Sequence, residues 1–277
     1  LGAWADARAA KKRLLWLSTA GCVLGTLALM KAQPGVIVLS LFALGVSNYF
    51  YCMGEALIAS FLPEIARPHA LGRVSGWGWS FGYLGGMLTL GIALLLVARA
   101  SGQGLGAPDY VPAGTAVKAT VVALAAVPSL LWLKERTPAG VARSGGVFAR
   151  LQVAWFETRD HFPDFRLLLL CGACYHAGIT VVVTLSAVYA TEVMGFEMAQ
   201  TMLLVFTVNI AAAAGAFLFG HVQDRVGHKR SLAITLVGWI VMVLIAFVAV
   251  QAWVFWLAAT VAGLCLGTSQ SAGRAMV

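Results

Sequence analysis

Long runs of apolar residues alternate with short polar segments along the whole chain. Each run is close to the roughly 20 residues that an α-helix needs to cross the hydrocarbon core of a bilayer. Because that core holds no water for backbone amides and carbonyls, each run must satisfy its own hydrogen bonds as a helix. The pattern predicts an all-α membrane protein, a polytopic bundle of about eight transmembrane helices. The eight runs cover residues 14–30, 36–61, 74–97, 116–133, 166–190, 200–220, 232–250 and 253–270.

Basic residues gather in alternate connections between these runs. Sixteen of the 19 Lys and Arg residues lie on the side of the N-terminal segment, and only Lys31, Arg99 and Lys118 lie on the other side. Cytoplasmic connections of membrane proteins carry an excess of Lys and Arg. The distribution predicts that both ends of the chain are cytoplasmic, and we expect the membrane to be a bacterial inner membrane.

The longest connection, residues 134–165, divides the apolar runs into two groups of four. We therefore expect an N-terminal half-bundle over residues 1–133 and a C-terminal half-bundle over residues 166–277. The spacing of apolar residues within the connection favours an amphipathic helix along the cytoplasmic face, and a partly ordered linker is the alternative. The apolar positions at helical spacing are Phe148, Leu151, Trp155 and Phe162.

Composition agrees with a membrane protein and excludes several other classes. Apolar residues make up 60% of the chain and charged residues 11%, whereas a soluble domain carries about 25% charged residues. The net charge of +8 comes from the basic connections, so we expect no nucleic acid partner. All five cysteines lie inside apolar runs, which is typical of small buried side chains and not of disulfides or zinc ligands.

Motifs that carry enzyme chemistry are missing from the sequence. It has no paired carboxylates, no His/Cys spacing for a metal, no nucleophile elbow and no Walker sequence. We therefore expect no enzyme, no catalytic residues, no metal site and no cofactor.

Two polar segments resemble each other, one at the start of the chain and one after the sixth apolar run. In both, a glycine is followed four residues later by an aspartate and then by a basic cluster that opens an apolar run. The glycine permits close backbone approach, and the aspartate can cap the next helix or pair with an arginine. Two copies in comparable places argue for duplicated halves. The first copy has Gly2, Asp6 and Lys11, and the second has Gly220, Asp224, Arg225, Gly227 and Lys229.

These segments resemble the loop motif of the major facilitator superfamily, which lies between its second and third helices and again between its eighth and ninth. The second copy matches the motif well, and the first lacks the later glycine. Four further stretches are similar to the vacuole-effluxer-like branch of that superfamily, which includes a fungal vacuolar amino-acid effluxer. They run from Phe61 to Ala66, from Gly72 to Trp79, from Gly82 to Gly86 and from Gly267 to Arg274.

The resemblance implies a partial major facilitator fold in two pseudo-repeat halves, with the eight runs as helices three to ten of twelve. It implies secondary active transport of a small organic solute by alternating access, with amino acid efflux as the family's example. The implied partners are a small-molecule solute, the lipid bilayer and protons as a candidate coupling ion. One departure is Tyr175-His176-Ala177-Gly178, where the branch usually has Tyr-Asn-Asp-Gly.

One face of the second apolar run carries polar residues. Asn48, Tyr51 and Glu55 follow at i, i+3 and i+7, so they share one side of a helix. A charge at the centre of a membrane helix costs roughly 2.5–3.5 kcal/mol on insertion scales, so such residues usually face a cavity or the bundle interior. The stripe favours a solute path in which Glu55 binds a proton or a cationic group. Pairing of Glu55 with a basic connection residue is the alternative.

Polar residues in the C-terminal runs complete the candidate path. His176 is the only histidine inside an apolar run, and Thr180 follows it at i+4. A histidine can take up a proton near neutral pH, which suits a proton-coupled carrier, whereas a neutral imidazole bonded to a neighbouring helix is the alternative. Asn209 is either a path residue or an interhelical contact. Tyr175 precedes the histidine, and Gln270 lies near a helix end as a cavity or capping group.

A stripe of small residues lies in the third run. Gly78, Gly82 and Gly86 recur every four residues, with Gly85 beside them. Small residues let two membrane helices approach closely, so we expect this stripe to pack against another helix.

Two other functions compete with transport. A transporter-like sensor or scaffold would share all these features. A polytopic membrane enzyme needs acids or histidines clustered at one membrane face, and His221 and His228 do lie with Asp224 in one connection. Their seven-residue separation fits the loop motif better than a metal site.

Overall fold

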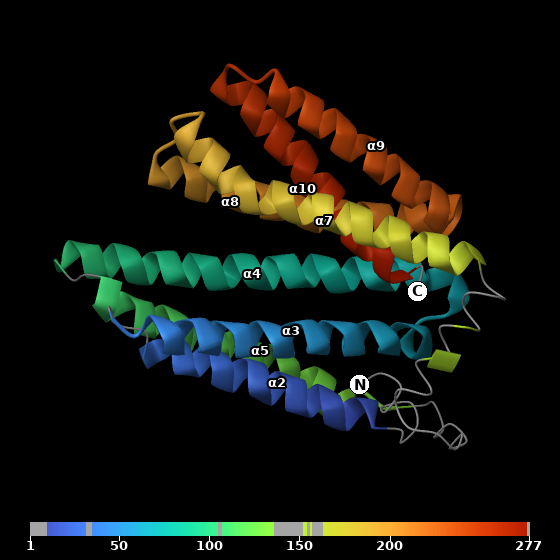
Figure 1. Cartoon of the computed structure of the whole chain (residues 1–277), viewed down its shortest axis with the longest axis horizontal. Coiled ribbons are helices and arrows are strands. Elements are labelled where there is room, and N and C mark those ends of the chain that lie inside the picture. The colour runs from blue at the N-terminus through green and yellow to red at the C-terminus, as the bar shows by residue number, and fades with distance from the viewer. Residues whose placement is uncertain are drawn as a thin grey trace. The chain divides into compact units, whose positions relative to one another are not determined.

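The computed structural model describes residues 10–31, 35–104, 107–135, 152–153, 156 and 163–275. Within them, eight long helices are long and apolar enough to span a membrane (Figure 1). The prediction of an all-α, polytopic helical bundle is confirmed. The long helices are α2 (Lys11–Ala28), α3 (Ile37–Ile65), α4 (Leu71–Gly102), α5 (Ala107–Trp132), α7 (Pro163–Glu192), α8 (Met198–Val226), α9 (His228–Phe247) and α10 (Ala252–Ala275), and two 3-10 turns are η1 (Leu29–Lys31) and η2 (Pro68–Ala70).

Several helices extend past the apolar run that predicted them. α3 continues to Ile65 through Pro63, and α8 continues to Val226 through Gly220. Hydropathy detects the part of a helix that lies in hydrocarbon, whereas backbone hydrogen bonding continues into the polar layer. The second copy of the motif therefore begins inside α8, and the chain turns only at Gly227, whose φ of +93° suits a residue without Cβ.

Contacts divide the chain into two compact units. The first half of α4 joins unit 2, although the predicted N-terminal half-bundle, residues 1–133, contains all of that helix. The half-bundle boundaries stay predictions. Most of the predicted linker, residues 134–165 with its amphipathic helix, lies outside the described residues. Unit 1 comprises Leu1–Ile65 and Leu88–Leu151, and unit 2 comprises Ala66–Met87 and Gln152–Val277.

In unit 1, α2 packs against both α3 and α5. The approach of α2 to α3 is close at Gly25, where a Cβ would lie 2.9 Å from the Ser47 backbone nitrogen. The Thr26 and Ser47 hydroxyls are hydrogen bonded across the same contact at 2.9 Å. Small and hydroxyl residues of this kind hold membrane helices together where apolar burial supplies little driving force. The buried core of the unit is Leu14, Leu15, Leu57, Phe61 and Leu130.

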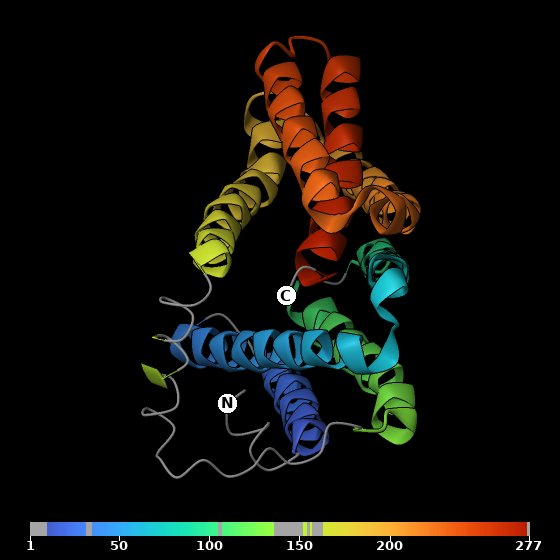
Figure 2. The same cartoon turned by 90° about the vertical axis from the view of Figure 1, so that its right-hand side faces the viewer.

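In unit 2, α10 packs along α8 and α9, and α9 and α10 run side by side in Figure 2. Glycines set the separation of α8 and α10, because a Cβ on Gly267 would overlap the carbonyl oxygen of Ala212. A Cβ on Gly215 would likewise overlap the carbonyl oxygen of Leu264. This packing of backbone on backbone sets the position of α10 against α8.

Candidate functional site

A polar site in unit 2 lies where the N-terminus of α4 meets the last turn of α8. The Asp224 carboxylate accepts a hydrogen bond from the Gly72 backbone N–H at 2.9 Å and another from the Arg73 N–H at 3.1 Å. The first four amides of an α-helix have no partner within the helix. A carboxylate there satisfies two of them and interacts favourably with the helix dipole. Asp224 therefore caps α4 from 152 residues further along the chain.

Three glycines make this approach possible. A Cβ on Gly72 would lie 3.0 Å from the Gly220 carbonyl oxygen, and a Cβ on Gly220 would lie 2.9 Å from the Gly72 carbonyl oxygen. A Cβ on Gly76 would overlap the carbonyl oxygen of Ala216. Any side chain at these positions would force the backbones apart, and the two amides of α4 would then move out of reach of Asp224.

Buried serine hydroxyls add hydrogen bonds across the same surface. Ser75 Oγ donates to the Ser271 carbonyl oxygen of α10 at 3.0 Å. Ser80 Oγ lies 2.8 Å from the Ala213 carbonyl oxygen of α8, and equally close to the carbonyl oxygen of Gly76 in its own helix. Because the acceptors are backbone atoms, these bonds join α4 to α8 and α10 without any charged side chain.

The structure changes one expectation about the second copy of the motif. The sequence suggested that the aspartate caps the following helix or pairs with an arginine. In the structure Asp224 caps α4, and α9 begins at His228 without a side-chain cap. Hydropathy does not reveal which distant helix end lies beside a loop. Arg225 and Lys229 are exposed.

The first copy of the motif is described only in part. Gly2 and Asp6 lie outside the described residues, whereas Lys11 begins α2. Its amine donates to Glu64 of α3 at 2.9 Å, and both side chains are 10% exposed. The backbone N–H groups of Lys11 and Lys12 lie 3.1 and 3.5 Å from the Glu135 carboxylate oxygens. A carboxylate beyond the end of α5 thus caps α2, and a buried ion pair ties α2 to α3.

Two predicted path residues of α7 meet the end of α10. The rings of Tyr175 and His176 stack with centroids 4.5 Å apart. A Cβ on Gly273 would lie 2.5 Å from Tyr175 Oη and 3.9 Å from His176 Nε2, so the missing side chain admits both rings. Thr180 Oγ1 donates to the His176 carbonyl oxygen within α7. Gln270 lies three residues before Gly273 on α10, on the same helix face.

The remaining path candidates lie on other helices. On α3, Asn48 and Tyr51 are exposed and Glu55 is half-buried. On α8, the Asn209 amide donates to the Val205 carbonyl oxygen of its own helix at 2.8 Å. The path assignment of all these residues stays a prediction.

The predicted glycine stripe lies beside the glycines that make close contacts. A Cβ on Gly78, Gly82, Gly85 or Gly86 would meet no atom of the described residues within 4 Å. Gly72 and Gly76 have the same four-residue spacing and do meet α8. Among the described residues, the close approach of α4 therefore uses a stripe that starts six residues earlier.

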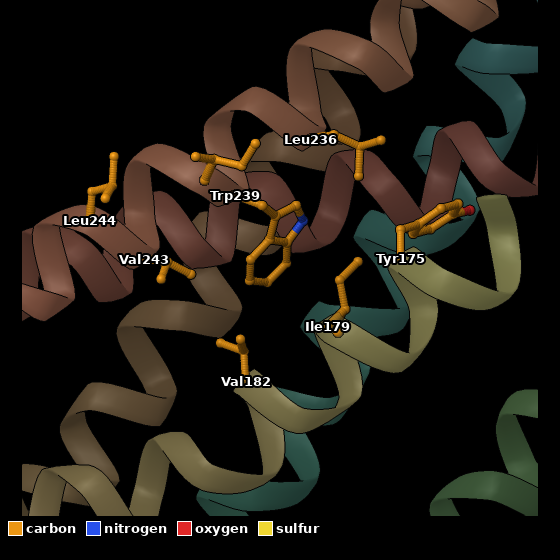
Figure 3. Close-up of a pocket in the computed structure, with 9 residues that line it drawn as sticks. Tyr175, Ile179, Val182, Leu236, Trp239, Val243 and Leu244 are labelled. Atoms are coloured by element: carbon orange, nitrogen blue, oxygen red, sulfur yellow. The ribbon is translucent and has the colours of Figure 1, made fainter.

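An apolar pocket of about 390 Å³ lies between α7 and α9 (Figure 3). The Trp239 indole occupies its wall, and its Nε1 is buried without a hydrogen-bond partner in the described part of the chain. The pocket suits apolar groups, because its walls offer almost no polar atoms. The lining residues are Tyr175, Gly178, Ile179, Val182, Leu236, Trp239, Ile240, Val243 and Leu244.

Sequence reasoning missed several residues of these sites. Glu64 carried a signal, since it follows Pro63 at the end of an apolar run, where a carboxylate can meet the basic start of another helix. Ser75 gave a weaker signal, because a serine is common on any membrane helix. Trp239 gave none, since an aromatic residue inside an apolar run looks like any other core residue.

Comparisons with known proteins agree with these observations. Residues 70–277 match the family model described as "Vacuole effluxer Atg22 like". The chain is also 23% identical over 285 aligned positions to an uncharacterized MFS-type transporter, YxiO, of Bacillus subtilis (strain 168). That alignment covers 99% of this chain and 64% of the relative, so the chain spans less than two thirds of the relative's length. Both matches point to a transporter and not to an enzyme. The chain belongs to the Atg22-like vacuole effluxer family of MFS-type proteins.

Proposed function

We propose that this chain forms the central part of a secondary active transporter that moves a small organic solute across a membrane by alternating access. The family match supports transport. The observation that carries the mechanism is the hydrogen bonding of Asp224 to the Gly72 and Arg73 amides. This pair of hydrogen bonds, which we call the Asp224 tie, joins segments that are far apart in the chain. The bonds are made to backbone atoms, and they can break without unfolding a helix.

The strength of this tie suits a reversible step. A hydrogen bond to a charged group contributes about 1.5–3 kcal/mol. A net difference of about 2 kcal/mol shifts a two-state equilibrium roughly 30-fold. That is enough to favour one conformation, and small enough for solute binding to reverse. The neutral contacts through Gly72, Gly76 and Ser75 add no buried charge that would have to be desolvated again on closing.

The proposed solute path uses the polar residues of α3 and α7. Glu55 and His176 are the titratable members, and either can carry the coupling proton. Efflux of an apolar amino acid is our proposal for direction and solute class, since the family description names an effluxer. We place both ends of the chain, and with them Asp224, on the cytoplasmic side of a bacterial inner membrane, because the basic residues gather there. The path residues are Asn48, Tyr51, Glu55, Tyr175, His176, Thr180, Asn209 and Gln270.

The test is transport by the full-length protein in proteoliposomes, with radiolabelled amino acids and sugars, with and without an inward proton gradient. We expect saturable flux that rises with the gradient and falls at least tenfold in Glu55→Gln or His176→Ala. His69→Ala, an exposed histidine on η2, is the matched control and should transport normally. Flux unaffected by the gradient and by both variants would remove these residues from the path. Absence of flux for every solute would contradict transport.

A further inference from the structure

A histidine of α8 contacts an aromatic residue of α4 beside the Asp224 tie. The rings of His221 and Trp77 lie with their centroids 6.2 Å apart, at an interplanar angle of 49°. Each ring follows a glycine of the closest backbone contact, since a Cβ on Gly220 would lie 3.3 Å from the Gly76 Cα. The pair therefore joins the same two helices as the tie, and the rings separate when these helices part.

One hydrogen bond determines where His221 can take up a proton. Its Nδ1 lies 2.8 Å from the Phe217 carbonyl oxygen, one turn earlier on α8. A carbonyl has no hydrogen to give, so Nδ1 carries the hydrogen and donates it. The other nitrogen, Nε2, makes no hydrogen bond to a described residue, and the side chain is partly exposed. A proton from water therefore binds at Nε2 and leaves the Nδ1 bond intact.

Protonation places a positive charge beside two aromatic rings. The Phe217 ring also contacts the imidazole, with its centroid 5.1 Å from that of His221. A cation about 6 Å from the centre of an aromatic ring is attracted by the quadrupole of the ring, and tryptophan attracts it most strongly. Phe217 belongs to α8 and stays beside His221 wherever α4 lies, whereas Trp77 comes from α4. The attraction to Trp77 thus favours the arrangement in which α4 and α8 are in contact.

The charges around this end of α8 leave that preference in place. Asp224 lies one turn beyond His221, in the direction opposite to Phe217, and its oxygens already accept hydrogen bonds from two amides of α4. Arg225 belongs to the same helix, so it repels a protonated His221 equally whether or not α4 is in contact. Arg73 of α4 is exposed, where water and salt screen its repulsion. The charged and titratable residues at this end of unit 2 are Arg73 of α4, Asp224 and Arg225 of α8, His228, Lys229 and Arg230 of α9, and Arg274 of α10.

We infer that His221 and Trp77 form a pH-sensitive contact, which holds α4 against α8 more tightly when His221 is protonated. Because the proton is favoured while the rings are in contact, the added strength is present at low pH. It is lost as the pH rises through the range in which imidazoles titrate. Since both contacts join the same helices, the proton also favours the closed form of the Asp224 tie. His221 lies outside the proposed solute path, and the inference holds whether or not the protein carries a solute.

The test is a double-mutant cycle on the purified full-length protein in detergent micelles, at about pH 5.5 and at about pH 8. His221→Gln removes the titratable ring, Trp77→Leu removes the aromatic face, and a third variant combines the two changes. Denaturant titration gives the unfolding equilibrium constant of each protein. The coupling between the rings is the factor by which the double variant departs from the product of the two single effects. We expect this coupling to be about two- to fivefold larger at the lower pH, as a cation–π contact at an exposed site predicts.

His228 provides the matched control, because it is another histidine near this end of α8. Its Nδ1 lies 2.6 Å from Gln223 Nε2, and no aromatic contact with Trp77 is expected. A cycle of His228→Gln with Trp77→Leu should therefore give the same coupling at both pH values. Trp77→Phe should retain part of the pH effect, since phenylalanine keeps a ring that attracts cations less strongly. If His221→Gln does not elute as a folded monodisperse protein, His221→Phe takes its place in the cycle.

Three results would overturn the inference. They are equal coupling at both pH values, a larger coupling at the higher pH, and a pH effect of the same size in the His228 cycle. Flux assays on the same samples separate this inference from the transport proposal. Coupling that grows at low pH in a protein without flux leaves the contact standing and contradicts transport. Flux with a coupling that does not depend on pH leaves transport standing and removes the pH-sensitive contact.

Discussion

Two helices of this chain begin against a carboxylate supplied from elsewhere, and the two units surround that carboxylate differently. In unit 1, Glu135 caps α2, and the adjacent Lys11–Glu64 ion pair is largely buried. In unit 2, Asp224 caps α4, and the surface by which α4 meets α8 and α10 carries glycine backbones and serine hydroxyls. The same capping chemistry is thus combined with buried charge in one unit and with neutral close packing in the other.

This difference indicates that the helix contacts of the two units have different roles. A buried ion pair that loses one partner leaves an unpaired charge, which makes separation of its helices expensive. Neutral contacts between small residues leave no such charge when they part. We therefore infer that the ion pair of unit 1 holds α2 against α3 permanently. The glycine and serine contacts of unit 2, by contrast, can break and form again.

The largest expected effect comes from removing the Lys11–Glu64 ion pair of unit 1. Lys11→Met keeps the alkyl stem but leaves Glu64 without its amine, and we expect a loss of about 3 kcal/mol of unfolding free energy. The measurement is denaturant titration of the purified full-length protein in detergent micelles. Lys12→Met, at the neighbouring and more exposed lysine, should change stability by no more than about 0.5 kcal/mol.

A double variant sharpens this test. Adding Glu64→Gln to Lys11→Met removes the carboxylate charge that had faced the Lys11 amine and should restore part of the lost stability. If the loss of unfolding free energy in the double variant equals the sum of the losses in the two single variants, the ion pair does not hold α2 against α3.

The second effect concerns the close packing of unit 2. Gly76→Ala places a methyl group against the Ala216 carbonyl oxygen, and we expect a loss of about 2 kcal/mol in the same titration. Gly78→Ala meets nothing within 4 Å in the described residues and should be neutral or stabilising, by up to about 1 kcal/mol, because alanine favours a helix. Equal effects of the two substitutions would contradict the assignment of the contact surface.

The third effect compares the two caps. Asp224→Ala and Glu135→Ala each remove a cap and should each cost about 1 kcal/mol of stability. Only Asp224→Ala should also lower solute flux in proteoliposomes by more than its folded fraction explains. If Glu135→Ala lowers flux equally, the two caps do not differ in function.

The smallest effect concerns single hydroxyl groups. Ser47→Ala in unit 1 removes the hydrogen bonds of one hydroxyl to Thr26 and Cys22 of α2, and Ser75→Ala in unit 2 removes the hydrogen bond to Ser271 of α10. An interhelical hydrogen bond is worth about 0.6 kcal/mol in membrane proteins. Thermal unfolding should show similar small losses for both variants. A loss several times larger at Ser75 would show that the surface of unit 2 is more rigid than we infer.

The sequence predicts the helices well because the bilayer leaves few choices. An apolar run of sufficient length in a bilayer must be a helix, so hydropathy alone predicts it without information about which other helices it contacts. The ends are less certain, as α5 shows. Its helix begins at Ala107, whereas the apolar run begins near residue 116, because polar residues at a helix start lower hydropathy without breaking hydrogen bonding.

Pairings between distant segments are the part that sequence reasoning did not reach. On α4 two small-residue stripes alternate, one through Gly72, Gly76 and Ser80 and one through Gly78, Gly82 and Gly86. Both have four-residue spacing, so spacing alone cannot say which one contacts a helix. The cap on α4 likewise depends on which helix end lies beside Asp224, and local propensity does not encode that.

Because of the cap on α4, hydrogen exchange at two backbone amides can report how often the hydrogen bonds to Asp224 are broken. Amides at the start of a helix normally exchange their hydrogens with water quickly, because they lack an internal partner. While Asp224 holds them, the amides of Gly72 and Arg73 are protected. Their deuterium uptake would therefore follow the fraction of time that the tie is open, in the unlabelled protein and without any reporter group attached.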